Sequence, residues 1–456
     1  MAKKKKDRDL LDAESSYDKL FDGLTQEMGR AFPGQVFTGV EAEQLLICLP
    51  VPALSIRYLL QQEGWPLGRF TMIVGEQESC KSALSYEIAR WHRLQQGRAT
   101  YLDTENKPSP ELMWSIVQYD KQAIDYHKAK TLDQWQEAMT RWMAALKGRM
   151  DGVGDKPGFG RIAPYCFVVD SLTAALADKT HTNIADEGHT KKRFADEASS
   201  LTDYIKYITK EIDGYPFSFI GINHLKPGQT PTGIPTRNIG GGRALRFHQA
   251  TEFEMRRKSS INPTTKAGAA TRLIDGRRTE VIDIQIAVTK NSNAPHRFVD
   301  VEMLWYTDFD TTDSRVIVDS QTGTQRTVSG HPQRTYFDWH STSVEILLDL
   351  QKDRGNRASK LLNDLFYIEG NDDRRHCWCK DLGVNEKSKI SWAEMGQVLE
   401  DRLATDHALA DALYPLLGIR RRPMYQSGTD YRDLMRASIS QMAAAVPTAD
   451  GPPAEE

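Results

Sequence analysis

The stretch that decides the fold runs from Arg69 to Ser82 and reads RFTMIVGEQESCKS, an apolar run followed by a short polar turn. The residues that follow, ALSYEIARWH, are expected to form a helix. This order predicts a buried strand, a loop and a helix. The loop GEQESCKS follows the phosphate-binding pattern G-x4-G-K-S/T except at one position. In that pattern, backbone N–H groups at the start of the helix surround phosphate oxygens.

This loop predicts a nucleotide site with ATP and Mg²⁺ as cofactors. Lys81 is placed to contact the β- and γ-phosphates, and Ser82 to bind Mg²⁺. Cys80 stands where the pattern has glycine, so the segment alone leaves an ordinary strand-to-helix turn equally open. The residues expected at the nucleotide are Gly75, Glu76, Gln77, Glu78, Ser79, Cys80, Lys81 and Ser82.

The thiol of Cys80 has an unusual predicted setting. It lies beside Lys81 at the expected start of a helix. The positive end of the helix dipole and the ammonium group both favour a thiolate. We therefore expect Cys80 to react before Cys166, which lies on a buried strand, and bound ATP to shield it.

Two acidic residues end further apolar runs. Asp170 closes FVVDS, and an acid there is expected to reach Mg²⁺ through water at the carboxyl end of a parallel strand. Glu105, in TYLDTEN, is placed to orient and polarise an attacking water. Taken singly, each acid more often marks only the end of a strand.

Short apolar runs alternate with amphipathic segments along the first two thirds of the chain. Strands buried on both faces and separated by helices predict a mainly parallel α/β sheet. The expected parallel strands are FTMIVG, ATYLDT, YCFVVDS and FSFIGIN, with a helix at LDQWQEAMTRWMAALKGR. VIDIQIAV and RFVDVEMLW alternate more and predict antiparallel strands that continue the sheet.

Changes of texture predict five parts of the chain. The middle insertion is rich in Thr, Ser, Asp and Gly, and the segment after it contains amphipathic helices such as SWAEMGQVLEDRL. The expected parts are a helical arm at 1–44 that serves oligomerisation, an ATPase core at 45–306, an insertion or linker at 307–335, a mostly helical C-terminal domain at 336–446, and an acidic disordered tail at 447–456.

Composition excludes several classes of protein. Hydrophobic residues make up 39% of the chain, and no apolar run approaches the length that crosses a bilayer, so no membrane partner is expected. Five scattered cysteines do not form a disulfide framework, which fits a reducing cytoplasm. His376, Cys377 and Cys379 are too few and too close for a usual zinc finger. The net charge of −3 means that a DNA site has to be a local basic patch.

Five segments together resemble the core of the RecA recombinases, in the same order and at similar spacing. They lie within residues 45–305 and read WPLGRFTMIVGEQESCKSAL, YLDTENKPSPELM, CFVVDSLTAAL, FIGINHLKPG and GGGRALRFHQATEFEMRR. The resemblance implies a RecA-like P-loop NTPase fold. It also implies a DNA-dependent ATPase that forms a helical filament on single-stranded DNA and pairs it with a homologous duplex.

The resemblance also implies roles for single residues. Glu105 would activate water, Asp170 would belong to the Mg²⁺ shell, and His224 would sense the γ-phosphate where most RecA proteins have glutamine. With His224 and Cys80 at these positions, the chain resembles the phage UvsX-type branch of the family. This resemblance implies that the protein acts in the cytoplasm of a phage-infected bacterium.

One implied contact crosses between subunits. In the RecA family two lysines reach into the ATP site of the neighbouring subunit, and the corresponding stretch here is VTKNSNAP. Lys290 matches the first lysine, whereas Ser292 replaces the second. The resemblance therefore supports activation at the interface in part.

Two polar stretches correspond to the DNA-binding loops of the family, 177–193 and 226–246. Solvated surface loops are the alternative. The residues expected to contact DNA are Lys191, Lys192, Arg193, Lys226, Arg237, Arg243 and Arg246. Single-strand-binding and mediator proteins are further expected partners.

Two other functions fit the same residues. A RecA-core helicase or DNA motor would form a closed ring and move along DNA. A nucleotide-gated DNA-binding scaffold would hydrolyse little ATP, as the departures at Cys80 and Ser292 allow.

Overall fold

The structure is a computed structural model of the chain. It describes residues 46–106, 110–118, 120–153, 156–157, 162–174, 193–229, 235–239, 244–258, 270–274, 277–292, 295–306, 309–318, 325–332, 335–352, 357–370, 376–427, 429–435 and 437. Cys48–Tyr431 forms one compact unit. A second unit, Met1–Ile47 with Arg432–Glu456, contains the predicted arm and tail, and nearly all of it lies outside the described residues.

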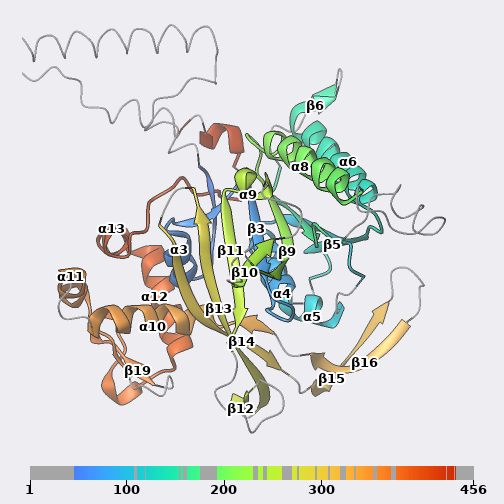
Figure 1. Ribbon diagram of the computed structural model, residues 1–456. Coiled ribbons are helices and arrows are strands. Elements are labelled where there is room, and N and C mark those ends of the chain that lie inside the picture. The colour runs from blue at the N-terminus through green and yellow to red at the C-terminus, as the bar shows by residue number, and fades with distance from the viewer. Residues whose placement is uncertain are drawn as a thin grey trace, which may run out of the picture. The chain divides into compact units, whose positions relative to one another are not determined.

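Among the residues that the structure describes, a sheet of eleven strands organises the compact unit (Figure 1). Six neighbouring strands are parallel, in the order β11 (Thr251–Arg257), β3 (Arg69–Gly75), β9 (Phe217–Gln229), β8 (Tyr165–Asp170), β4 (Arg98–Asp103) and β5 (Ile124–Lys128). Antiparallel strands complete it: β13 (Arg277–Asn291), β14 (Arg297–Tyr306) and β17 (Tyr336–Phe337) beyond β11, β12 (Ala270–Ile274) on β13, and β10 (Pro235–Ile239) on β9. The predicted α/β class, with a mainly parallel sheet and an antiparallel continuation, is confirmed.

Helices cover both faces of the sheet. They are α4 (Lys81–Leu94), α6 (Leu132–Asp151) and α8 (Arg193–Glu211). Phe217 and Phe219 of β9 belong to the apolar cluster formed with α6 and α8. Ser218 points to the other face because neighbouring side chains alternate along a strand, and its Oγ is hydrogen bonded at 2.9 Å to Nε2 of His92 in α4. Therefore α4 covers the face opposite α6 and α8.

The helix α6 shows how local sequence produces these layers. Thr131 caps it by accepting a hydrogen bond from the N–H of Gln134 at 3.3 Å. Its buried side chains recur every three or four residues, at Leu132, Trp135, Met139, Met143, Leu146 and Met150. This spacing places one apolar stripe against the sheet.

The C-terminal helices pack beside α3 (Leu54–Leu60), as Figure 1 shows. They are α10 (Trp339–Lys352), α11 (Arg357–Leu365), α12 (Trp392–Thr405) and α13 (His407–Leu416). Ser55 of α3 donates a hydrogen bond to the carbonyl of Trp339 at 2.7 Å. The half-buried Arg57 and the buried Glu400 form an ion pair at 2.8 Å. These helices thus belong to the same compact unit as the sheet.

Two stretches expected to be irregular contain regular structure. Within 307–335, β15 (Phe309–Val318) and β16 (Gln325–Pro332) pair as an antiparallel hairpin. Within 226–246, β9 continues to Gln229 and pairs with β10, and α9 (Ala244–His248) follows. The remaining short elements are β1 (Cys48–Pro50), β2 (Gly64–Pro66), α5 (Pro110–Ile116), β6 (Gly152–Val153), β7 (Lys156–Pro157), β18 (Glu369–Gly370), β19 (Cys377–Trp378) and 3₁₀ turns at Lys380–Leu382 and Glu386–Ser388.

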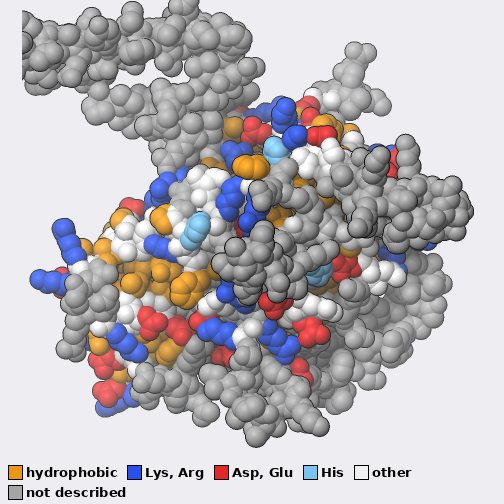
Figure 2. All heavy atoms as spheres, in the orientation of Figure 1, with side chains coloured by type: hydrophobic (Ala, Val, Ile, Leu, Met, Phe, Trp, Pro, Cys, Tyr) orange, Lys and Arg blue, Asp and Glu red, His pale blue; other side chains and the backbone are white. Residues whose placement is uncertain are grey.

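The described surface has no strong charge bias on the face that Figure 2 shows, where acidic and basic side chains are interspersed. This agrees with the near-neutral net charge of −3 for the chain. In the part of the chain that the structure describes, no helix is both long enough and apolar enough to span a bilayer.

Candidate functional site

The predicted phosphate-binding loop joins β3 to α4, as expected from the sequence. Gly75 ends β3, and a Cβ there would lie 2.4 Å from the carbonyl oxygen of Met255 and 2.5 Å from Oγ of Ser79. Only glycine fits such a close approach. Oγ of Ser79 donates to the carbonyl of Glu76 at 2.8 Å and closes the loop on itself. Lys81 is the first residue of α4.

Two residues of the loop have left-handed backbone conformations without being glycine. The φ angles are 61° at Glu78 and 62° at Cys80. The conformation at Cys80 explains why the common pattern has glycine there, since a side chain costs about 1 kcal/mol in this region. Glu78 is exposed, as are Glu76 and Gln77, and its carboxylate lies 3.7 Å from the guanidinium of Arg257.

The predicted thiolate at Cys80 is wrong. Burial raises the pKa of the Cys80 thiol to about 11, although the nearby charges of Arg257 and Lys81 favour the thiolate. Desolvation of the charged form outweighs these attractions because the sulfur is largely enclosed. Cys80 is nevertheless half-buried, whereas the other four cysteines are buried.

The side chain of Lys81 folds back into the loop. Its Nζ donates to the carbonyl of Glu76 at 2.5 Å and lies 3.4 Å from Oγ of Ser79. The ammonium group is buried, with 5% of the residue exposed, and these partners are neutral oxygens. A buried ammonium group at a helix N-terminus fits a phosphate.

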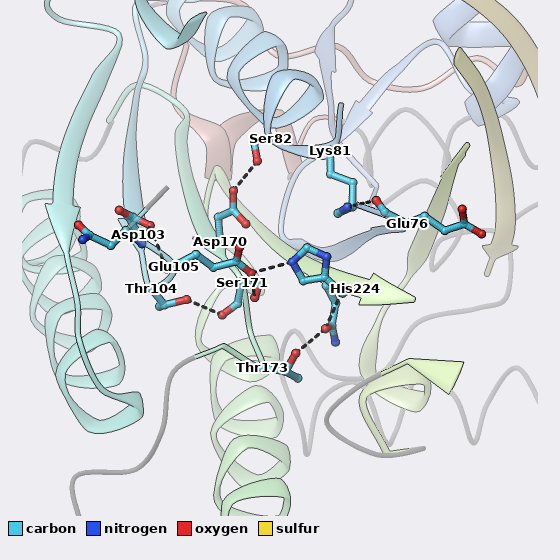
Figure 3. A network of polar contacts seen from close by, with 12 residues as sticks. Glu76, Lys81, Ser82, Asp103, Thr104, Glu105, Asp170, Ser171, Thr173 and His224 are labelled. Carbon is cyan, nitrogen blue, oxygen red and sulfur yellow. Dashed lines mark hydrogen bonds and ion pairs between the residues drawn. The ribbon is translucent and has the colours of Figure 1, made fainter. Parts of the chain in front are cut away.

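Ser82, near the start of α4, contacts Asp170, at the end of β8 (Figure 3). Oγ of Ser82 donates to Oδ2 of Asp170 at 2.5 Å. Burial raises the pKa of Asp170, while hydrogen bonds from Ser82 and Tyr101 oppose the shift. Hydroxyl and carboxylate oxygens are ligands that Mg²⁺ prefers, and the serine oxygen keeps lone pairs for an ion while its proton is donated. This pair therefore fits Mg²⁺.

Glu105 and His224 lie together at the same edge of the sheet (Figure 3). Nε2 of His224 is 2.7 Å from Oε1 of Glu105, which also accepts from Oγ of Ser171 at 2.6 Å. His224 is in register with Gly75 on the neighbouring strand. The structure thus places both residues near the start of the phosphate loop. The carboxylate of Glu105 and the imidazole of His224 can each hydrogen bond to a water, and the imidazole can also donate to a phosphate oxygen.

A turn built on Asp103 presents Glu105. Oδ1 of Asp103 accepts hydrogen bonds from the backbone N–H groups of Glu105 at 3.0 Å and Asn106 at 2.8 Å. Its other oxygen accepts from the hydroxyl of Tyr126. Asp103 and Tyr126 were not predicted from the sequence, although an Asp two residues before the predicted base is a signal for such a turn.

Lys290 lies away from the phosphate loop of its own chain. It is near the end of β13, paired with Glu252 of β11, and its Nζ donates to the carbonyl of Arg246. Burial and the charge of Arg246 lower the pKa of Lys290, and Glu252 opposes them. The structure therefore does not bring Lys290 to the other predicted catalytic residues within one chain.

The predicted DNA contacts are described only in part. Three of them lie outside the described residues: Lys191, Lys192 and Arg243. Of three more the structure describes the backbone but not the side chain: Arg193 at the start of α8, Lys226 on β9 and Arg237 on β10. Arg246 of α9 is exposed, and its Nε is 3.6 Å from Oε2 of Glu252.

One comparison with known proteins bears on this geometry. The protein named Protein RecA of Fusobacterium nucleatum is 24% identical over 258 residues, which are 54% of this chain and 57% of that protein. The chain is similar to a RecA protein. It spans little more than half the length of that relative. No protein-family model matches the chain.

Proposed function

We propose that the chain is an ATP-dependent DNA recombinase that assembles on single-stranded DNA and promotes homologous pairing and strand exchange. The observation that carries the proposal is the contact of Asp170 with Ser82, which directly follows the loop that encloses Lys81. Similarity to a RecA protein over 258 residues supports the recombinase class. His224 and Cys80 support the phage UvsX-type branch of that class.

The phosphate end of the site follows from these contacts. Lys81 leaves the neutral oxygens of Glu76 and Ser79 for the more negative phosphate oxygens, because a charge-assisted hydrogen bond is the stronger one. Backbone N–H groups at the start of α4 bind the remaining phosphate oxygens. Mg²⁺, when bound, neutralises charge that develops on the phosphates.

Glu105 accepts a proton from the attacking water in this proposal. Asp103 holds the backbone of Glu105 and Ser171 holds its carboxylate, so the base is oriented before substrate arrives. His224 shares a hydrogen bond with the same carboxylate and lies next to the phosphate loop. His224 lies on β9, and β9 continues into the predicted DNA-binding segment. A movement of His224 when the γ-phosphate binds would therefore shift β9 and that segment.

The test is a paired assay of ATP turnover and strand pairing. We expect single-stranded DNA to stimulate turnover, filaments to form on that DNA, and a homologous duplex to be paired. Closed rings that unwind or move along DNA would instead indicate a motor. Nucleotide-dependent DNA binding without turnover would indicate a scaffold.

A further inference from the structure

The hydroxyl of Tyr101 donates a hydrogen bond to Asp170, the carboxylate of the proposed metal site. Tyr101 lies on β4, is 1% exposed, and bonds to Oδ2 of Asp170. Ser82 donates to the same oxygen. Within the described residues, both hydroxyl contacts are made to Oδ2 and none to Oδ1. Two donors on one oxygen fix the rotation of a carboxylate, whose terminal torsion is otherwise broad.

Neighbouring rings hold Tyr101 in place. The ring of Tyr86, from α4, lies 5.1 Å away between centroids, and the ring of Tyr126, from β5, lies 6.1 Å away at an interplanar angle of 12°. Tyr126 itself donates to Asp103. The hydroxyl of Tyr101 is therefore set by packing before any ligand binds, which is the arrangement that preorganises a site.

We propose that Tyr101 is a positioning residue that directs the carboxylate of Asp170 toward Mg²⁺; this rests on the proposed ATP site. Phenylalanine would fill the same volume and stack on the same rings, so packing alone does not require the hydroxyl. The hydroxyl acts through Asp170. Ser82 has one hydroxyl proton and already donates it to Oδ2, so it does not make up for the loss of the second donor.

A positioning role and a purely structural role of Tyr101 predict different effects of Mg²⁺ concentration on ATP turnover. Removing the hydroxyl leaves Asp170 with one donor and a freer torsion, so more Mg²⁺ is needed to complete the site. Loss of one hydrogen bond to a charged group corresponds to about a tenfold change or more in an equilibrium constant. Once Mg²⁺ saturates the site, turnover should return to nearly the normal rate.

The experiment compares Tyr101→Phe with Tyr165→Phe. Tyr165 is a buried tyrosine at the far end of β8 from Asp170, and its hydroxyl is hydrogen bonded to Thr100 at 2.8 Å. We expect Tyr101→Phe to raise the free Mg²⁺ concentration for half-maximal ATP turnover by about tenfold. Tyr165→Phe should leave it unchanged. ATP binding without Mg²⁺ should be the same in all three proteins, which checks folding.

Two results would overturn the proposal for Tyr101. One is an unchanged Mg²⁺ requirement, and the other is lost turnover at every Mg²⁺ concentration. If the unaltered protein hydrolyses no ATP, the proposed function fails instead. Mn²⁺ binding in the presence of ADP, followed by electron paramagnetic resonance, still tests Tyr101 in that case: weaker Mn²⁺ binding by Tyr101→Phe supports the role, and equal binding rejects it.

Discussion

At the scale of single residues, the proposed ATP binding and the proposed hydrolysis depend on different contacts. Lys81 is enclosed by the loop oxygens of Glu76 and Ser79. Glu105 is held outside that loop by Ser171 and His224. Since these two sets of contacts do not share a residue, substitutions in one should leave the other intact.

We therefore expect Lys81→Ala to abolish ATP binding and Glu105→Gln to preserve it. The glutamine keeps the size of the side chain but cannot accept a proton, so turnover should fall by about 10²- to 10⁴-fold. Equilibrium binding of a fluorescent ATP analogue and steady-state phosphate release give the two readouts. Turnover at the normal rate in Glu105→Gln would show that another group is the base.

Alkylation of Cys80 should depend steeply on pH. Its pKa is raised to about 11 by burial, so the thiolate is a minor species near neutral pH. Because the thiolate is the reactive form, labelling should speed up about tenfold for each pH unit up to that value. Peptide mapping by mass spectrometry should find Cys80 labelled first, since the other four cysteines are buried.

Nucleotide should protect the same thiol. In the proposed site, ATP with Mg²⁺ occupies the loop in which Cys80 lies, so the labelling of Cys80 should slow when both are present. Equal labelling with and without nucleotide would place Cys80 away from the phosphates. A rate that does not change between pH 7 and 9 would contradict the raised pKa instead.

At the scale of elements, the strands that are buried on both faces could be predicted from the sequence. Runs such as FVVDS and FSFIGIN became β8 and β9 because strands buried on both faces have a distinctive pattern. The hairpin of β15 and β16 was missed because its polar residues look like a loop. The tyrosines at positions 101 and 126 were missed because aromatic residues are ordinary in strands, and only the fold shows which carboxylates they reach.

The segment after β9 carries the prediction about DNA. Its basic residues include Arg243, outside the described residues, and Arg246 on α9. Replacing both with alanine should weaken binding to all single-stranded sequences and reduce the salt slope by about 1.4, the value for two phosphate contacts. Arg141→Ala, on the exposed side of α6, is the control and should leave the slope unchanged. An unaltered slope in the double variant would exclude phosphate contact.

At the scale of the whole molecule, a catalytic role for Lys290 would require a second copy of the chain. Its strand partner, Glu252, is in register with Met72 of β3. Met72 precedes the phosphate loop by three residues, which is about 10 Å along a strand. Two strand spacings separate β13 from β3 as well, another distance of about 10 Å. A lysine side chain does not span both, so a role in catalysis has to be played in a neighbouring subunit.

Mixing two inactive variants tests this arrangement. Lys81→Ala removes the phosphate cation of a subunit, and Lys290→Ala removes the residue that it would lend to its neighbour. Each variant alone should hydrolyse little ATP. In a head-to-tail assembly that contains both variants, a site is complete where a subunit with an intact Lys81 faces a neighbour with an intact Lys290. With equal amounts and random mixing, about a quarter of all sites meet this condition. ATP turnover should therefore recover to about that fraction of the normal rate. If subunits are shown by cross-linking to assemble together and no activity returns, Lys290 does not act between subunits.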